Sequence, residues 1–213
     1  MADMAKVMLS EFEEMLVNNS DWILTKHTII EKVSKMLSMQ VAVINENFST
    51  KAALQVPGIK ACRPKISKGE NYQQLPYVIL DYPAIFSRTD VFALRTMFWW
   101  GKFISVSLHL SGQYKNTIQD TLSKNIKNET GPFYLSTGSE EWQHHFEESN
   151  YSAIALLSPQ AIHKKIMQPS FIKVALKYDL TQWNNIDHLL KEAYSKMALI
   201  LLPFSFQSGE TDL

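Results

Sequence analysis

Two runs of β-branched, aromatic and other apolar residues, Val91–Trp100 and Phe103–Leu110, lie on either side of the dipeptide Gly101-Lys102. Such runs are typical of strands, and a glycine in the first central position suits the type II′ turn that joins antiparallel strands. With this two-residue turn, Trp100 pairs with Phe103. The sequence therefore predicts a β-hairpin over about 91–110, and the fold must contain an antiparallel pair of strands.

Side chains alternate between the two faces of a strand, so the predicted register divides the hairpin into two sets. One face is strongly apolar and carries Arg95 opposite Leu108, whereas the other mixes apolar residues with small hydroxyls and His109. The neighbouring residues Trp99 and Trp100 must point to opposite faces. We therefore expect the second face to need covering helices or a partner surface.

Helical patterns dominate the first quarter of the chain. Apolar residues recur with helical spacing over Met8–Leu16, and Thr28 with Glu31 forms a capping box that predicts the start of a longer helix. The apolar stripe of this second helix consists of Ile30, Val33, Leu37, Val41, Ile44 and Phe48. We expect an N-terminal helical segment over about 5–54.

Further strands are indicated on both sides of the hairpin. Residues 57–75, which contain prolines, glycines and lysines, predict a long connection with little regular structure. The β-branched and aromatic run Tyr77–Tyr82 predicts a strand that follows it. Near the C-terminus, Phe171–Tyr178 alternates in polarity, which predicts a half-exposed strand with Lys173 on its exposed side.

Three later helices are also predicted. A capping-box pattern over Thr137–Glu140 indicates a short helix that continues through Phe146. Ser158 followed by Pro159 is typical of a helix start, with serine as the N-cap. The last helix is expected over about 182–202, because apolar residues recur there with helical spacing.

This order of elements favours an α+β fold over a strictly alternating βαβ fold. We predict a mostly antiparallel sheet with a central hairpin at about 91–110, covered by helices mainly on one face. Residues 1–203 are expected to form a single domain, and residues 204–213 a disordered tail.

Composition and charge exclude several classes of function. The 21 basic and 21 acidic residues balance, so the chain lacks the basic footprint of a general nucleic-acid binder. Cys62 is the single cysteine, which excludes an intramolecular disulfide and a cysteine-based zinc cage. The first residues do not resemble a signal peptide, and no apolar run approaches the ~20 residues of a membrane span. We expect a cytoplasmic protein with no nucleic-acid or membrane partner.

Motifs for common cofactors and nucleophiles are missing from the sequence. It contains no glycine-rich phosphate loop, no Gly-x-Ser-x-Gly elbow and no His-Glu-x-x-His zinc motif, so no cofactor is expected. The cluster of glutamates and histidines over Glu140–Glu148 places Glu141 and His145 one turn apart on a helix. Such a pair supplies two ligands at most, and we expect no metal there.

Chemistry-bearing side chains gather in and beside the hairpin. An arginine inside an apolar strand needs a partner, and Asp90 or Asp81 is expected to pair with Arg95. His109 is expected to bond a serine or the backbone. The predicted ligand-binding residues are Tyr82, Arg88, Asp90, Arg95, Trp99, Trp100 and His109.

Two classes of function remain open. The first is a binding module for a small ligand or another protein subunit, including a homo-oligomer, and it requires an exposed apolar patch that contains Trp99 or Trp100. The alternative is an enzyme that uses acid–base or metal-assisted chemistry through Arg95, His109 and a nearby carboxylate. That alternative requires these groups to converge in a concave pocket.

Overall fold

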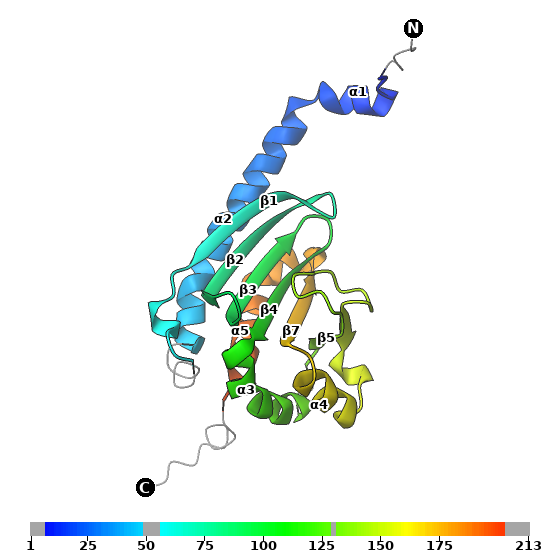
Figure 1. Ribbon diagram of the computed structural model, residues 1–213. Coiled ribbons are helices and arrows are strands. Elements are labelled where there is room, and N and C mark those ends of the chain that lie inside the picture. Colours follow the sequence, from blue (N-terminus) through cyan, green and yellow to red (C-terminus); the bar gives the residue numbers. More distant parts are fainter. Residues whose placement is uncertain (1–6, 49–55, 129–130, 203–213) are drawn as a thin grey trace.

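The computed structural model describes residues 7–48, 56–128 and 131–202, and these contain a seven-stranded sheet in the order β1-β2-β3-β4-β7-β5-β6 (Figure 1). All neighbouring strands in it pair antiparallel. The strands are β1 (Lys65–Tyr72), β2 (Leu75–Phe86), β3 (Val91–Trp99), β4 (Phe103–Ser111), β5 (Tyr134–Ser136), β6 (Tyr151–Ala153) and β7 (Phe171–Asp179). The predicted α+β fold with its mostly antiparallel sheet is confirmed.

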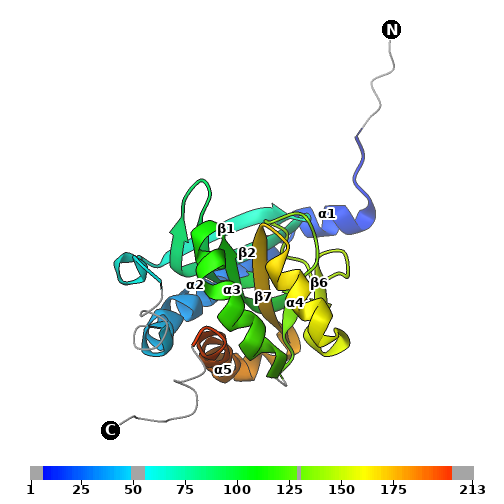
Figure 2. The same cartoon turned by 60° about the horizontal axis from the view of Figure 1, so that its bottom comes forward.

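Helices pack on one face of this sheet, as Figures 1 and 2 show. The α-helices described are α1 (Glu11–Val17), α2 (Ser20–Phe48), α3 (Gly112–Asn125), α4 (Pro159–Met167) and α5 (Ile186–Leu199). Short 3₁₀ helices are η2 (Ile59–Ala61), η3 (Ile126–Asn128), η4 (Ile154–Leu156) and η5 (Leu180–Asn185). The main core lies between the helices and the sheet, where fully buried strand residues include Leu94, Val106 and Val174.

Local sequence explains where these helices begin. The Ser10 hydroxyl accepts from the Glu13 amide, and the Glu13 carboxylate accepts from the Ser10 amide, which completes a capping box for α1. Ser158 caps α4 as predicted, since its hydroxyl accepts from the Ala161 amide. The predicted start at Thr28 is wrong, because α2 begins at Ser20 and the Thr28 hydroxyl bonds back to the Leu24 carbonyl inside it.

The hairpin is confirmed, but its predicted register is wrong by one residue. Trp99, not Trp100, pairs with Phe103, and a three-residue connection joins the strands. Gly101 in this connection has φ of 66°, a left-handed conformation that glycine adopts without steric cost. The shift places Arg95 opposite Ser107, on the same face of the sheet as His109.

Residues 137–150, called here the covering loop, lie over the face of the sheet that the helices leave open. Tyr72 explains why the helix predicted through Phe146 is wrong. Its hydroxyl accepts hydrogen bonds from the amides of His144 (2.7 Å) and His145 (3.1 Å), which a helix would use internally. Phe146 itself stacks on Tyr151, with ring centroids 4.6 Å apart.

Two other expectations need correction. The connection predicted over 57–75 contains strand β1, which pairs with β2 along most of its length. The strand predicted to be half-exposed, β7, is buried over its first six residues because the covering loop lies against it, and Lys173 is only 3% exposed.

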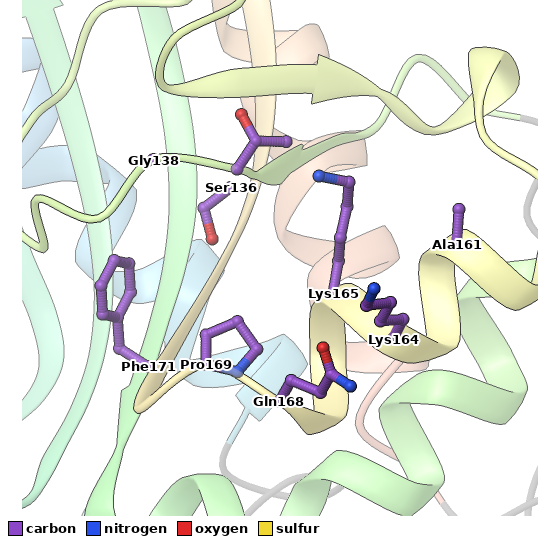
Figure 3. A pocket seen from close by; sticks show the side chains of 9 residues that line it. Ser136, Gly138, Ala161, Lys164, Lys165, Gln168, Pro169 and Phe171 are labelled. Carbon is purple, nitrogen blue, oxygen red and sulfur yellow. The ribbon is translucent and has the colours of Figure 1, made fainter.

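The fold also forms a pocket beside the covering loop. It opens between α4 and the start of the covering loop (Figure 3).

In the described ranges, no helix has both the length and the apolar character needed to cross a membrane. The predicted tail 204–213 and the end of the predicted N-terminal helical segment, 49–54, lie outside the described residues.

Candidate functional site

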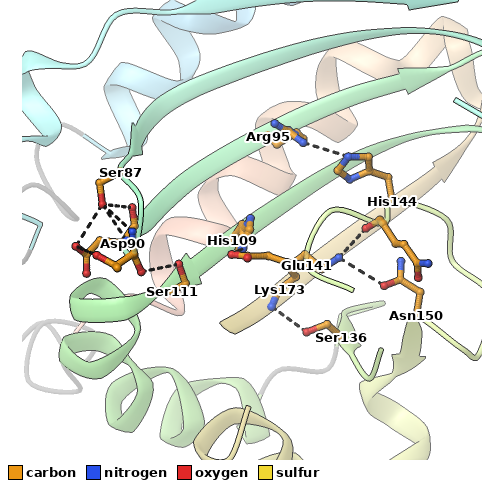
Figure 4. Close-up of polar contacts among 12 residues, drawn as sticks. Ser87, Asp90, Arg95, His109, Ser111, Ser136, Glu141, His144, Asn150 and Lys173 are labelled. Carbon is orange, nitrogen blue, oxygen red and sulfur yellow. Dashed lines mark hydrogen bonds and ion pairs between the residues drawn. The ribbon is translucent and has the colours of Figure 1, made fainter. Parts of the chain in front are cut away.

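The open face of the sheet carries a cluster of charged and polar side chains that the covering loop closes (Figure 4). Arg95 on β3 is at its centre. Its Nε and Nη2 atoms donate to both carboxylate oxygens of Asp81, at 2.7 and 2.9 Å, so Asp81 is its partner rather than Asp90. Its Nη1 atom lies 3.1 Å from Nε2 of His144 on the covering loop.

The contact with Arg95 determines the protonation of His144. A guanidinium only donates, so Nε2 of His144 must be an unprotonated acceptor. Burial lowers the pKa of His144 to about 3, and the charges of Arg95 and Lys173 act in the same direction. His144 is therefore a neutral acceptor near neutral pH, and a proton on it would place two cations side by side.

His109 on β4 contacts the covering loop through two residues. Its Nε2 lies 2.8 Å from a carboxylate oxygen of Glu141, and its ring meets that of Trp142 edge to face, with centroids 4.9 Å apart. Burial lowers the pKa of His109 to about 3, with Lys173 and Arg95 contributing. The neutral imidazole thus donates its Nε2 proton to Glu141, not to the serine or backbone group expected from the sequence.

Lys173 on β7 lies directly opposite His109 in the register of β4 and β7. Its Nζ donates to the carbonyl of Gln143 at 2.6 Å and lies 3.5 Å from Oδ1 of Asn150. Burial lowers the pKa of Lys173 to about 8, because two neutral oxygens replace water only in part. The side-chain amide of Asn150 also donates to the carbonyl of His145, which fixes the turn at the end of the loop.

These contacts indicate what the cluster does in the folded chain. Arg95, His109 and Lys173 each bond a different residue of the covering loop. Their side chains are largely buried, and Asp81 forms an ion pair with Arg95. Burial lowers the pKa of Lys173, and the negative charge of Glu141 acts in the opposite direction. The cluster therefore holds the loop against the sheet. Hydrogen bonds that involve charged groups are stronger than those between neutral groups, and they are strengthened further by burial.

A cavity of about 370 Å³ adjoins this cluster at the turn between β2 and β3. It is lined by Ser87, Arg88, Thr89, Val91, Ser111, Glu141, Trp142, Ser170 and Phe171. Arg88 is the predicted site residue that reaches it. Asp90 at the same turn accepts from the amide of Gln113 at 2.8 Å and from the hydroxyl of Thr89, so it organises the chain at the start of α3.

The remaining predicted residues lie elsewhere. Tyr82 bonds Asn45 of α2 at 2.6 Å and lines a separate cavity of about 290 Å³. Trp99 is buried on the open face of the sheet. Trp100 packs against the main core on the other side, and its half-buried ring meets Trp22 edge to face at 6.4 Å. The structure thus brings Arg95 and His109 together and distributes the other residues over separate sites.

A second feature is the N-terminal arm, defined here as residues 7–25. Figure 1 shows α1 and the first turns of α2 extending beyond the sheet. Apart from the part-buried Leu16, its large apolar side chains are between 45% and 93% exposed; they are Val7, Met8, Leu9, Phe12, Met15, Val17, Trp22, Ile23 and Leu24. No residue of α1 is buried, and burial on α2 begins only at Ile30.

Sequence reasoning missed Lys173 and His144 as partners of the hairpin. Lys173 and His109 are polar residues that interrupt two strongly apolar strands, and this was a signal that one sheet face has a polar covering. In the sequence, His144 stands out only as a member of the glutamate and histidine cluster over Glu140–Glu148. Within the ranges described, no group of three or more His, Cys, Asp or Glu side chains is arranged to hold a metal ion.

Comparisons of the chain with protein-family models, with curated proteins and with solved structures find no match.

Proposed function

We propose that this protein is an association module that pairs with a second copy of its own chain through the N-terminal arm. The observation that carries the proposal is the row of exposed apolar side chains on a helical segment that projects from the fold. Soluble monomers rarely expose apolar patches of this size. Trp22, next to the half-buried Trp100, links the arm to the tryptophan pair of the hairpin.

The gain from covering the arm is large enough to support a dimer. Burying a Leu- or Phe-sized side chain completely is worth roughly 1.5–3 kcal/mol, so covering one that is about half exposed is worth roughly 1 kcal/mol. Two arms that cover all nine exposed apolar side chains in each copy would therefore gain at most about 18 kcal/mol, against an association cost of about 4–15 kcal/mol. The balance favours pairing.

Charge complementarity supports a second copy as the partner. Helix α1 carries Glu11, Glu13 and Glu14 and has no basic residue in its last turn. Further along, the middle of α2 exposes Lys32 and Lys35 against a single exposed carboxylate, Glu31, and neither lysine forms a salt bridge within the described residues. Two arms that run antiparallel about a two-fold axis place the acidic α1 of each copy along the basic part of α2 in the other.

A groove on α2 offers a place for the partner's apolar side chains. It has a volume of about 400 Å³ and is lined by Asp21, Leu24, Thr25, Thr28, Ile29 and Lys32. The groove begins inside the arm and ends at the basic part of α2. Apolar side chains from the α1 of a second copy would occupy it while the glutamates of that helix approach Lys32.

The catalytic alternative has less support. It requires an open cavity at His109, but this ring is buried and is engaged by Glu141 and Trp142. Arg95 is likewise occupied by Asp81 and His144.

Light scattering coupled to size exclusion tests the proposal with the full chain. We expect a dimer at micromolar concentration, and a double variant Phe12→Ser/Leu24→Ser that dissociates at least about 30-fold more readily, since each lost contact occurs twice. Leu156→Ser is the matched control, because Leu156 is 84% exposed but lies on η4, outside the arm. Circular dichroism verifies that each variant remains folded.

Three outcomes would contradict the proposal. One is a monomer at about 100 µM, where a micromolar dimer would be saturated. Another is equal dimerisation of the arm variant and the Leu156 control. The third is arm-dependent binding of lipid vesicles by a chain that stays monomeric, which would make the arm a membrane-surface element.

A further inference from the structure

We propose that the pocket between α4 and the start of the covering loop binds a small phosphorylated metabolite. This lysine pocket has a volume of about 370 Å³ (Figure 3). It is lined by Ser136, Thr137, Gly138, Ala161, Lys164, Lys165, Gln168, Pro169 and Phe171. Its size is at the lower end of the range of small-molecule sites, which is about 300–1,000 Å³.

The charge of the pocket selects an anion. Lys164 and Lys165 lie in the last turn of α4, and Figure 3 shows the side chain of Lys165 extending from α4 toward Ser136. In the part of the chain that the structure describes, no salt bridge includes either lysine, and no carboxylate lines the pocket. Two ammonium groups without a carboxylate partner create a positive potential that an anionic ligand would neutralise.

The types of donor favour a phosphate over a carboxylate. A lysine acts as a compact point charge with rotatable donors, which suits a tetrahedral phosphate, whereas the planar carboxylate is best matched by the fork of an arginine. The Ser136 hydroxyl accepts from the amide of Lys173 at 2.9 Å, so its own proton is free to be donated to a ligand. Gln168 adds an amide, and Phe171 with Pro169 adds an apolar wall for the body of the ligand.

The wall formed by the covering loop is held in place before any ligand binds. The amides of Thr137 and Gly138 both donate to the carbonyl of Asn150, at 2.9 and 3.5 Å, and the Thr137 hydroxyl donates to the carbonyl of Glu148 at 3.1 Å. A Cβ atom on Gly138 would lie 2.7 Å from the carbonyl oxygen of Ser149, so only glycine permits this close packing. A preorganised wall lowers the entropic cost of binding.

Isothermal titration calorimetry of the full chain tests the site with ribose 5-phosphate as the probe, and with ribose and citrate as comparison ligands. At low salt we expect ribose 5-phosphate to bind with a Kd of about 1 mM or tighter. Lys164→Gln/Lys165→Gln should weaken this binding at least about tenfold. The matched control is Lys124→Gln, because Lys124 also lies in the last turn of its helix, α3, but lines none of the pockets described.

The result that supports the site is a tenfold loss in the double variant, with unchanged binding in the Lys124 variant and unchanged thermal unfolding in both. The proposal is overturned if ribose 5-phosphate shows no binding at about 10 mM, or if the double variant binds it as well as the wild type does. Equal binding of citrate would overturn the preference for phosphate, and equal binding of ribose would overturn the anionic class. None of these outcomes depends on dimerisation through the arm.

Discussion

The contact between Arg95 and His144 makes the fastening of the covering loop sensitive to acid. His144 accepts from the guanidinium at 3.1 Å, so the folded chain requires it to be neutral. Burial is the largest cause that lowers its pKa from 6.5 to about 3. Because the folded-state pKa is the lower one, the stability that this residue contributes is complete above about pH 6.5 and is lost as the pH falls toward 3.

The size of the loss follows from the two pKa values. At about pH 5 the unfolded chain favours protonated His144 by roughly 30-fold, while the folded chain still excludes the proton. This difference removes about 2 kcal/mol of the free energy of unfolding relative to pH 7. Other groups also titrate in this range, so the share of His144 must be measured as a difference between variants.

His144→Gln isolates that share, since the amide oxygen of glutamine can accept from Arg95 but cannot take up a proton. Urea unfolding followed by circular dichroism at pH 7 and pH 5 should show that this variant loses about 2 kcal/mol less than the wild type. His188→Gln on α5 is the control. The His188 side chain is 63% exposed and lies 3.5 Å from Glu192, and an exposed pair of this kind contributes little, so this variant should lose about as much stability as the wild type does. Equal losses in the wild type and His144→Gln would refute the reasoning, and so would an NMR titration of His144 with a midpoint near 6.5.

Further substitutions test the backbone and the buried ion pair of the sheet. Gly112→Ala should destabilise the chain by about 3 kcal/mol or more, because φ is 55° and the new Cβ would lie 2.5 Å from the Thr89 carbonyl oxygen. Gly101→Ala has φ of 66° but no atom within 4 Å, so its expected cost in thermal or urea unfolding is only about 1 kcal/mol. Asp81→Asn should cost about 3–5 kcal/mol by leaving Arg95 without a carboxylate partner. The double variant Asp81→Leu/Arg95→Met should cost less, and a larger cost for the double variant would contradict this account.

The helix-facing side of the fold could be predicted because periodicity carries the information there. The stripe read from the sequence of α2 is buried at Ile30, Val33, Leu37, Ile44 and Phe48, and the hairpin forms where its apolar runs indicate. The exact register could not be predicted. It depends on whether Trp100 continues the strand or joins the turn, and both choices satisfy the local preferences of glycine.

The polar side could be predicted only in part, because its partners come from distant parts of the chain. Pairing of Arg95 with an aspartate was foreseen, and Asp81 is the partner on the adjacent strand. The covering loop was predicted to be a helix, since a capping-box pattern says nothing about Tyr72, which lies 72 residues away and accepts from its backbone. Hydrogen bonds between residues that are far apart in the chain produce no periodic pattern in the sequence, so a local pattern cannot predict them.

The covering loop connects the polar cluster with the lysine pocket. The loop closes the polar face through His144 and supplies Thr137 and Gly138 to the pocket wall. The contact that holds the loop at Arg95 therefore also stabilises this wall. The loss of about 2 kcal/mol of stability near pH 5 would destabilise both the contact and the pocket wall. The arm projects from the opposite end of the molecule in Figure 1. The proposed surfaces for self-association and for ligand binding are thus separate in space, and only the proposed ligand site shares its support with the acid-sensitive contact.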